Sequence, residues 1–325
     1  MGGDERAVSE VLERTAVWRS DGVGIPEEAV REGCPQERNS MAEQIAYTKN
    51  GKIEQFGRIC FYAGLLLELL IVILDKSSWI NPLEGQMFRV SFLLFACKLC
   101  VTKYSKKEWL VVLAAGVIAG LCYLSSDRDE AVRAVVFVTS MKGIDHKKAL
   151  RVVFYVTLTG MAVLAALSLA GVLGEVWDAG AGYGIKEGSR RLCLGVGNSN
   201  ALAIMIWALM TLGVYLFHEK MKPVHWMLLG VLTVGVYAAT MTRTTFLIMA
   251  ATLVLAFVMD KSSKIREGSV VYIGGMAAVA AGFVFSLYAA HISNWYELMP
   301  DWVVRIDRIL PGRISSIYAF ENGGG

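Results

Sequence analysis

The sequence predicts an all-α membrane protein: a polytopic transmembrane helical bundle with about nine spans and a cytoplasmic N-terminus. Three observations lead to this fold class. Hydrophobic residues make up 55% of the 325 positions and charged residues 19%, with a mean hydropathy of +0.48. The apolar residues form long continuous runs, and lysines cluster in every second loop between them. A soluble protein of this composition would expose large apolar surfaces, whereas a bilayer accommodates them.

Each apolar run is expected to be one helix. A helix needs about 20 apolar residues to cross some 30 Å of hydrocarbon. Helices satisfy their own backbone in lipid, and the runs are too continuous for barrel strands. The second and fourth runs are short and carry Lys98, Arg133 and Lys142 near their ends. The expected spans are residues 58–75, 87–103, 108–125, 130–143, 151–174, 198–217, 225–241, 243–260 and 269–290.

The chain divides into three predicted regions. Residues 1–55 form a polar N-terminal tail that we expect to be disordered, residues 56–290 the transmembrane bundle, and residues 291–325 an extracytoplasmic amphipathic segment. The tail lacks the basic and apolar regions of a signal peptide. Because the stretch from Met41 leads directly into the first span, we expect Met41 to be the native start, with residues 1–40 not native.

Charge sets the predicted orientation. With the N-terminal side in the cytoplasm, all five inward loops carry a lysine-rich cluster, as the positive-inside rule requires. The outward loops hold arginines instead, and the planar guanidinium suits phosphate. This pattern predicts an outward site for a phosphorylated, membrane-bound ligand. The alternative is that individual arginines pair with neighbouring acids such as Asp129 and Asp307. The outward arginines are Arg128, Arg190, Arg191, Arg243, Arg305, Arg308 and Arg313, with Arg89 and Arg133 at the helix ends that face the same loops.

Arg243 has the strongest local argument. Residues 226–259 are too few for two full spans with a loop, so the tip at Thr240–Thr245 is expected at or slightly below the outer interface. A charge held there is costly and usually functional. Four threonines surround it and offer hydroxyl groups to an anion. The alternative is an arginine whose side chain reaches out to lipid head groups.

Arg190 and Arg191 follow a glycine-rich loop and precede the sixth span, which opens with Asn198, Ser199 and Asn200. The start of a helix offers free N–H groups and a positive dipole end to an anion. This arrangement is typical of a pyrophosphate cradle, while Asn198 or Ser199 acting as an ordinary helix cap is the alternative. No nucleotide P-loop is present.

The remaining candidates have simpler alternatives. Arg313 follows an amphipathic stretch that is expected to lie in the outer interface, where ordinary surface charges are also common. Glu68 in the first span is within expected reach of Lys98 in the second, as a structural or ion-coupling pair. Cys97 and Cys100 form a lone CxxC inside an apolar run, which favours buried thiols over a metal site. The net charge of +3 argues against nucleic acid as a partner.

Together, three motifs resemble the bacterial O-antigen polymerase and O-antigen ligase superfamily. Arg191 precedes Gly195-Val-Gly-Asn198-Ser199-Asn200, which is similar to the family's Gly-Phe-x-His-Pro-Asn motif, with Val196 for Phe, Asn198 for His and Ser199 for Pro. The hairpin Thr240-Met-Thr-Arg243-Thr-Thr245 resembles an Asn/Thr-Ser-Arg-Thr signature. Pro311-Gly-Arg313 resembles a Ser-Gly-Arg signature. The resemblance covers about residues 55–325.

The resemblance implies an inverting glycosyltransferase, a polysaccharide polymerase or ligase, that uses no metal or other cofactor in the bacterial cytoplasmic membrane. Its donor and acceptor would be undecaprenyl-pyrophosphate-linked glycans in the outer leaflet, and other polysaccharide-assembly proteins are expected partners. Arg191, Arg243 and His291 would be catalytic, and Arg190, Asn198, Asn200 and Arg313 would bind substrate. As the general base, His291, Glu297 and Asp301 remain alternatives.

Two other functions remain open. A transporter or flippase for lipid-linked glycans would also use outward arginines, but it would be expected to contain an internal repeat, which the sequence lacks. Family members usually continue with a large outer loop and further spans. Because this chain ends at Gly325, we expect a C-terminally truncated member, which includes the possibility of an inactive fragment or a membrane subunit.

Overall fold

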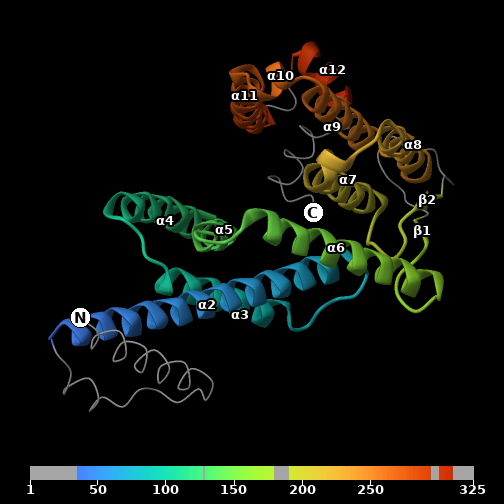
Figure 1. Ribbon diagram of the computed structural model, residues 1–325. Helices are drawn as coiled ribbons and strands as arrows, with labels where there is room; N and C mark the ends of the chain where they lie inside the picture. The colour runs from blue at the N-terminus through green and yellow to red at the C-terminus, as the bar shows by residue number, and fades with distance from the viewer. Residues whose placement is uncertain (1–34, 127–128, 179–189, 294–299, 310–325) are drawn as a thin grey trace. The chain divides into compact units, whose positions relative to one another are not determined.

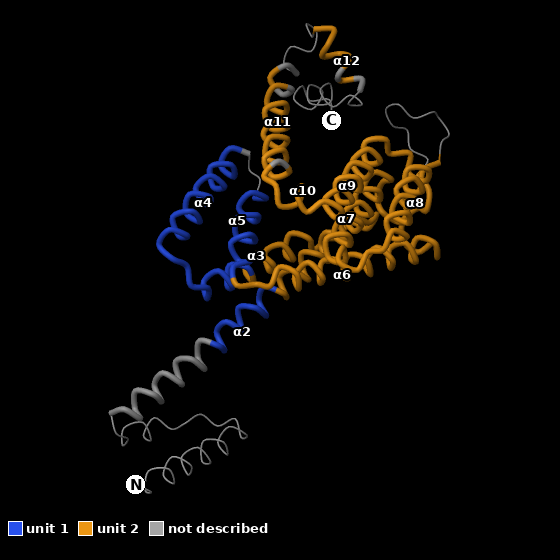
Figure 2. The backbone as a smooth tube through the Cα atoms, turned by 45° about the horizontal axis from the view of Figure 1, so that its top comes forward, with its two compact units in different colours: residues 1–61, 95–142 blue, residues 62–94, 143–325 orange. Residues whose placement is uncertain are grey.

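The computed structural model describes residues 35–126, 129–178, 190–293 and 300–309 (Figure 1). They form helices throughout, apart from one short antiparallel strand pair. The predicted all-α class is therefore confirmed. The chain falls into two compact units, coloured separately in Figure 2. Unit 1 comprises residues 1–61 and 95–142, and unit 2 comprises residues 62–94 and 143–325.

Seven helices in the described part of the chain are long and apolar enough to cross a membrane. They coincide with the first, third and fifth to ninth predicted spans, so the chain is a multi-pass membrane protein. The helices are α2 (Pro35–Lys76, with its span at Gly51–Lys76), α4 (Lys106–Ser126), α6 (His146–Leu169), α7 (Ser199–Phe217), α8 (Pro223–Thr240), α9 (Arg243–Lys261) and α11 (Ser269–Ser293).

The second and fourth predicted spans are helical but shorter or more polar. Helix α3 (Glu84–Val101) has 18 residues and includes Glu84, Arg89 and Lys98. Helix α5 (Glu130–Ser140) has 11 residues, or about 16 Å of helix, which is roughly half the hydrocarbon thickness. Seven of the nine predicted crossings thus have a helix of suitable length and composition. That α3 and α5 also cross the membrane stays a prediction.

Helix α2 begins at Pro35, inside the region assigned above to the polar tail, and runs without interruption for 42 residues. The first 34 residues lie outside the described part, as does the chain after residue 309. The shorter elements are η1 (His218–Lys220), α10 (Ser263–Glu267), α12 (Asp301–Ile309), β1 (Trp177–Asp178) and β2 (Arg191–Leu192).

In unit 1, an aromatic cluster joins three helices. Phe61 of α2 and Phe95 of α3 are almost fully buried, and their ring centroids lie 5.8 Å apart. Phe137 of α5 lies 6.2 Å from the first ring and 5.1 Å from the second. Helix α4 packs along α5 as a hairpin. These contacts hold α5 in place although it is too short to bury a long apolar face.

The loop between α3 and α4 is tied to the end of α5 by polar contacts. Lys142 Nζ lies 2.6 Å from a Glu108 carboxylate oxygen, donates to the Lys103 carbonyl at 2.9 Å, and sits over the Tyr104 ring. The Tyr104 hydroxyl donates to the Thr139 carbonyl at 2.8 Å. The lysine-rich loop is therefore a fixed part of unit 1.

Unit 2 is built around α7, which packs against α6, α8 and α9. One buried cluster joins α2, α6 and α7 through Ile73, Met161, Leu164, Val196 and Leu202. A second joins α7, α8 and α9 through Ala203, Met210, Val236 and Met249.

Small residues and hydroxyl groups bring the helices of unit 2 close together. A Cβ at Gly160 would collide with Ile73, and one at Gly213 would meet Phe154 at 3.3 Å. Trp207 Nε1 donates to Thr252 Oγ1 at 3.1 Å, which links α7 to α9. Small contact residues and hydrogen bonds between helices are the usual means of association in lipid.

Reporter fusions test the number of crossings. If α3 and α5 do not cross, α4 runs in the opposite direction and the loop Lys103–Lys107 lies on the side opposite to Lys142–Arg151. We expect a fluorescent protein fused after Lys103, Gly143 or Lys220 to fluoresce in a bacterial host in all three cases, because lysine-rich loops remain in the cytoplasm. Alkaline phosphatase, which is active only outside the cytoplasm, is fused at the same three positions in parallel. Phosphatase activity at Lys103 alone would instead establish seven crossings.

Candidate functional site

The segment between α6 and α7 places Arg191 just before the N-terminus of α7, which is called the head of α7 below. Asp178 and Trp177 pair with Arg191 and Leu192 in the antiparallel strands β1 and β2. Beyond the strands, the N–H groups of Cys193 and Gly195 donate to the carbonyls of Val176 and Glu175 at 2.9 and 3.1 Å. The chain is thus held by backbone hydrogen bonds until α7 begins.

Two glycines let this segment pack closely. Gly195 has φ +76°, and a Cβ there would lie 3.0 Å from both the Leu164 carbonyl oxygen and Ser168 Cβ. Gly174 has φ +65°, and a Cβ there would collide with Ser78 Oγ. Both positions need a left-handed backbone and leave no room for a side chain, which explains part of the glycine enrichment seen in the sequence.

The end of α2 is attached to the same segment. Ser77 forms a β-bridge with Val196, and Gly197 N–H donates to the Lys76 carbonyl at 2.8 Å. Ser77 Oγ also accepts from Trp79 N–H at 3.1 Å, which turns the chain away from α2. The C-terminal end of α2 and the N-terminal end of α7 therefore lie together at one end of unit 2.

Arg191 is largely buried there, with 11% of its side chain exposed. Its Nη2 lies 3.4 Å from Asp178 Oδ2, a long contact for an ion pair. Its Nε is buried and has no hydrogen-bond partner among the described residues. The neighbouring Arg190 is exposed. Arg191 is thus held in place and has an unused hydrogen-bond donor, whereas Arg190 extends into solvent.

Asn198 is the N-cap of α7. Its Oδ1 accepts from Ala201 N–H at 2.8 Å, so the capping alternative is confirmed for this residue. Ser199 is fully buried, and its hydroxyl has no partner in the part of the chain that the structure describes. Asn200 is exposed in the first turn. The backbone N–H groups of Ser199 and Asn200 donate to no described residue.

Arg243 is the first residue of α9, separated from the end of α8 by two residues, and it is exposed. The tight turn that the sequence predicted is present. Met241 adopts φ +55°, and the buried hydroxyls of Thr240 and Thr242 hydrogen-bond at 2.8 Å. Two of the four threonines thus stabilise the turn itself.

The topology brings Arg191 and Arg243 to the same end of unit 2. Strand β2 packs on α8, and α7, α8 and α9 pack on one another in succession, as Figure 1 shows. Short connections make these helices alternate in direction, so the head of α7 and the α8–α9 turn face the same way.

The candidate bases lie near the contact between α11 and α12. Tyr288 stacks on Trp302 with a centroid distance of 6.1 Å. His291, which is exposed, comes one turn after Tyr288, and Asp301 directly precedes Trp302. Glu297 and Arg313 lie outside the described residues.

Several polar residues prove to have structural partners. Glu68 accepts from the Ser91 hydroxyl at 2.8 Å, and Lys98 donates to Thr102 Oγ1 at 2.8 Å, so each has a partner other than the one predicted. Arg133 pairs with Asp129 at 2.8 Å, as the pairing alternative for outward arginines proposed. Burial raises the pKa of the Cys193 thiol, which keeps it protonated and unreactive near neutral pH.

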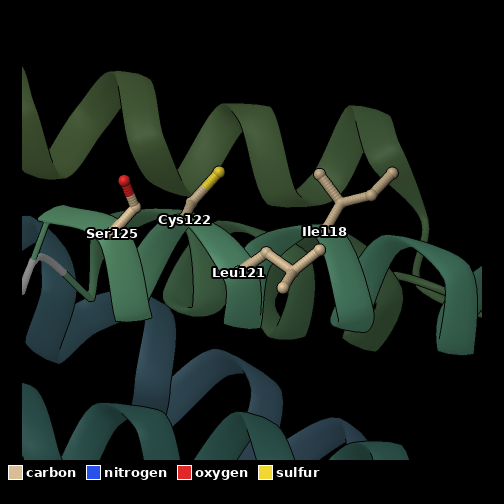
Figure 3. Close-up of a pocket in the computed structure, with 4 residues that line it drawn as sticks. All are labelled: Ile118, Leu121, Cys122 and Ser125. Carbon is tan, nitrogen blue, oxygen red and sulfur yellow. The ribbon is translucent and has the colours of Figure 1, made fainter.

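One pocket lies on α4, lined by Ile118, Leu121, Cys122 and Ser125 (Figure 3). Its lining comes from a single helix and carries no charged group. These properties are typical of a shallow groove that faces lipid. None of the sequence-predicted site residues belongs to it.

Comparison with known proteins yielded no relative: no family model matches the chain, and no curated protein or solved structure is significantly similar to it.

Sequence reasoning missed the residues that support the site. Asp178 contacts Arg191, and the Lys76–Ser78 segment holds Gly195 and Gly197 in place. Ser78 and Gly195 are 117 positions apart, so no local pattern connects them. The one available signal was the excess of glycine before α7, which predicts close backbone approach without naming the neighbour.

Paired glycine substitutions test the packing of this segment. Gly171 also has a left-handed backbone, with φ +70°, but a Cβ there would meet nothing within 4 Å. We expect Gly171→Ala to cost about 1 kcal/mol from backbone strain alone. Gly195→Ala should cost at least about 1 kcal/mol more, because the backbone oxygens around it cannot move away. Thermal unfolding of the purified protein in detergent measures both, and equal losses would contradict the close packing described here.

Proposed function

We propose that this protein transfers glycans from a lipid pyrophosphate carrier, as an O-antigen polymerase or ligase does, with the head of α7 receiving the pyrophosphate. The substrate would be an undecaprenyl-pyrophosphate-linked oligosaccharide in the outer leaflet of the bacterial cytoplasmic membrane, and the acceptor a second lipid-linked glycan.

The observation that supports the proposal is a surplus of hydrogen-bond donors between Arg191 and Asn200. Among the described residues, Arg191 Nε and the Ser199 hydroxyl are buried and have no hydrogen-bond partner, and nothing accepts from the first N–H groups of α7. Asp178, at 3.4 Å, is the only carboxylate in ion-pair contact with Arg191 among the described residues. Buried unpaired donors are rare in native proteins, and an anion completes such a set.

Arg243 adds a second charge from the same end of the helix group. As an exposed arginine at a rigid turn, it is suited to the outer phosphate of a pyrophosphate, while Arg191 stabilises the inner one. A glycosyl transfer places developing negative charge on the leaving pyrophosphate. Fixed guanidinium groups and helix N–H groups stabilise that charge in the transition state.

The acceptor hydroxyl must lose a proton as it attacks the sugar carbon and the bond to pyrophosphate breaks. His291 and Asp301, on either side of the Tyr288–Trp302 contact, are the described groups that could take that proton, and the proposal leaves both open. Arg313 and Glu297 keep the roles predicted from the sequence.

Complementation tests the proposal. The gene, with its genomic continuation, is expressed in a bacterium that lacks its own surface-polysaccharide polymerase, and the length ladder of lipid-linked glycan is measured. We expect Arg191→Ala and Arg243→Ala to reduce the ladder to single repeats, because each removes a charge from the pyrophosphate. Arg191→Lys should restore part of the ladder at most, since lysine lacks the planar fork.

Arg151→Ala is the matched control. It removes one exposed guanidinium from α6 at the lysine-rich end and should leave the ladder unchanged. Membrane levels of all variants are compared by immunoblot. A full ladder from both Arg191→Ala and Arg243→Ala at normal protein levels would overturn the proposed site.

A further inference from the structure

A buried lysine lies where α2 crosses α3 in unit 1. Lys98 is 6% exposed, and its side chain runs against Gly57, where a Cβ would lie 3.1 Å from Lys98 Cδ and 2.8 Å from Val101 Cγ2. The glycine therefore provides the space that the lysine occupies. Lys98 Nζ donates to Thr102 Oγ1, one turn nearer the loop. An ammonium group has three donors, and this bond to a neutral hydroxyl uses one of them.

The charges around Lys98 do not balance. Glu54 and Arg58, both exposed on α2, are the charged groups that act on it electrostatically. Neither Lys98 nor Arg58 forms an ion pair with any described residue. Lys98 and Arg58 thus carry two positive charges, and Glu54 is the one nearby carboxylate among the described residues, without an ion pair to either. A buried charge without a close counter-charge is costly, so a partner from outside the chain is favoured.

The depth of the cluster identifies the kind of partner. Arg58 is the first residue of the apolar run predicted as the first span, residues 58–75, and the turns of α2 before it carry Lys52, Glu54 and Gln55. From Arg58 to Lys76, α2 has 19 residues, or about 28 Å, which matches some 30 Å of hydrocarbon. Lys98 lies in the last turn of α3 beside Gly57. Arg58 and Lys98 are therefore at the boundary between hydrocarbon and head groups, within reach of lipid phosphates.

We propose that Arg58 and Lys98 bind the phosphate of an anionic phospholipid at the end of α2 and α3 that adjoins the lysine-rich loop Lys103–Lys107. Arg58 presents its guanidinium to the lipid, and Lys98 adds a fixed charge behind it. Basic pockets between membrane helices on the lysine-rich side are suited to such head groups. The exposed Lys103 at the end of α3 adds to the attraction.

Thermal unfolding of the full chain in detergent tests this site, with three additives: phosphatidylglycerol, phosphatidylcholine of the same acyl chains, and inorganic phosphate. A ligand that binds the folded state raises the unfolding temperature in proportion to its affinity. We expect phosphatidylglycerol to stabilise the wild type more than either other additive. Arg58→Gln and Lys98→Met should each weaken the affinity for phosphatidylglycerol about tenfold, the typical effect of losing one charged hydrogen bond.

Lys107→Gln is the control. It removes the same charge from an exposed position in the first turn of α4 and should change the affinity less than about twofold. Equal weakening by all three substitutions would mean attraction to the general charge and would overturn the site. So would equal stabilisation by both lipids, or stabilisation by inorganic phosphate that matches phosphatidylglycerol. If Lys98→Met does not fold, Arg58→Gln decides the question, because Arg58 is exposed.

Discussion

Inside hydrocarbon no water is available to a backbone N–H or carbonyl, so each must be satisfied within its own helix. The apolar side chains of this protein gain little from leaving lipid for a helix contact, since lipid is equally apolar. Close approach and specific hydrogen bonds must therefore hold the helices together. Gly160 and Gly213 allow that approach in unit 2, and Trp207 bonds to Thr252 across α7 and α9. In contrast, α11 buries none of the residues of its apolar span.

Irregular backbone appears where the chain leaves the spans. Between α6 and α7, strands β1 and β2, the left-handed glycines and the bridge from Ser77 to Val196 form a rigid assembly. Its rigidity comes from backbone bonds and from the lack of space around Gly195, so side chains such as Arg191 and Ser199 are not needed to hold it. Those polar groups are therefore available for a ligand, and the same assembly keeps them in fixed positions.

Hydropathy located the helices well, because the free energy of placing a residue in lipid is a local property. Helix α7 was predicted at 198–217 and lies at Ser199–Phe217; α9 was predicted at 243–260 and lies at Arg243–Lys261. The fourth span was predicted at 130–143, but α5 ends at Ser140 and Met141 to Gly143 form a turn. Polar partners were the least predictable feature. Glu68 bonds to Ser91, and Arg191 contacts Asp178, because folding brings together positions that no sequence pattern connects.

The two-residue connection between α8 and α9 also constrains how the protein is made. A turn of this length, with Met241 in a left-handed conformation, is too short for one helix to lie in the bilayer while the other remains outside it. The two helices must enter together as a hairpin, and in the predicted orientation Arg243 must cross the bilayer with them. Carrying one arginine through the bilayer centre costs about 2.5–3.5 kcal/mol on the translocon scale. The 37 residues of the two helices are mainly apolar and offset that cost, so a polar substitution in either helix would act first on biogenesis.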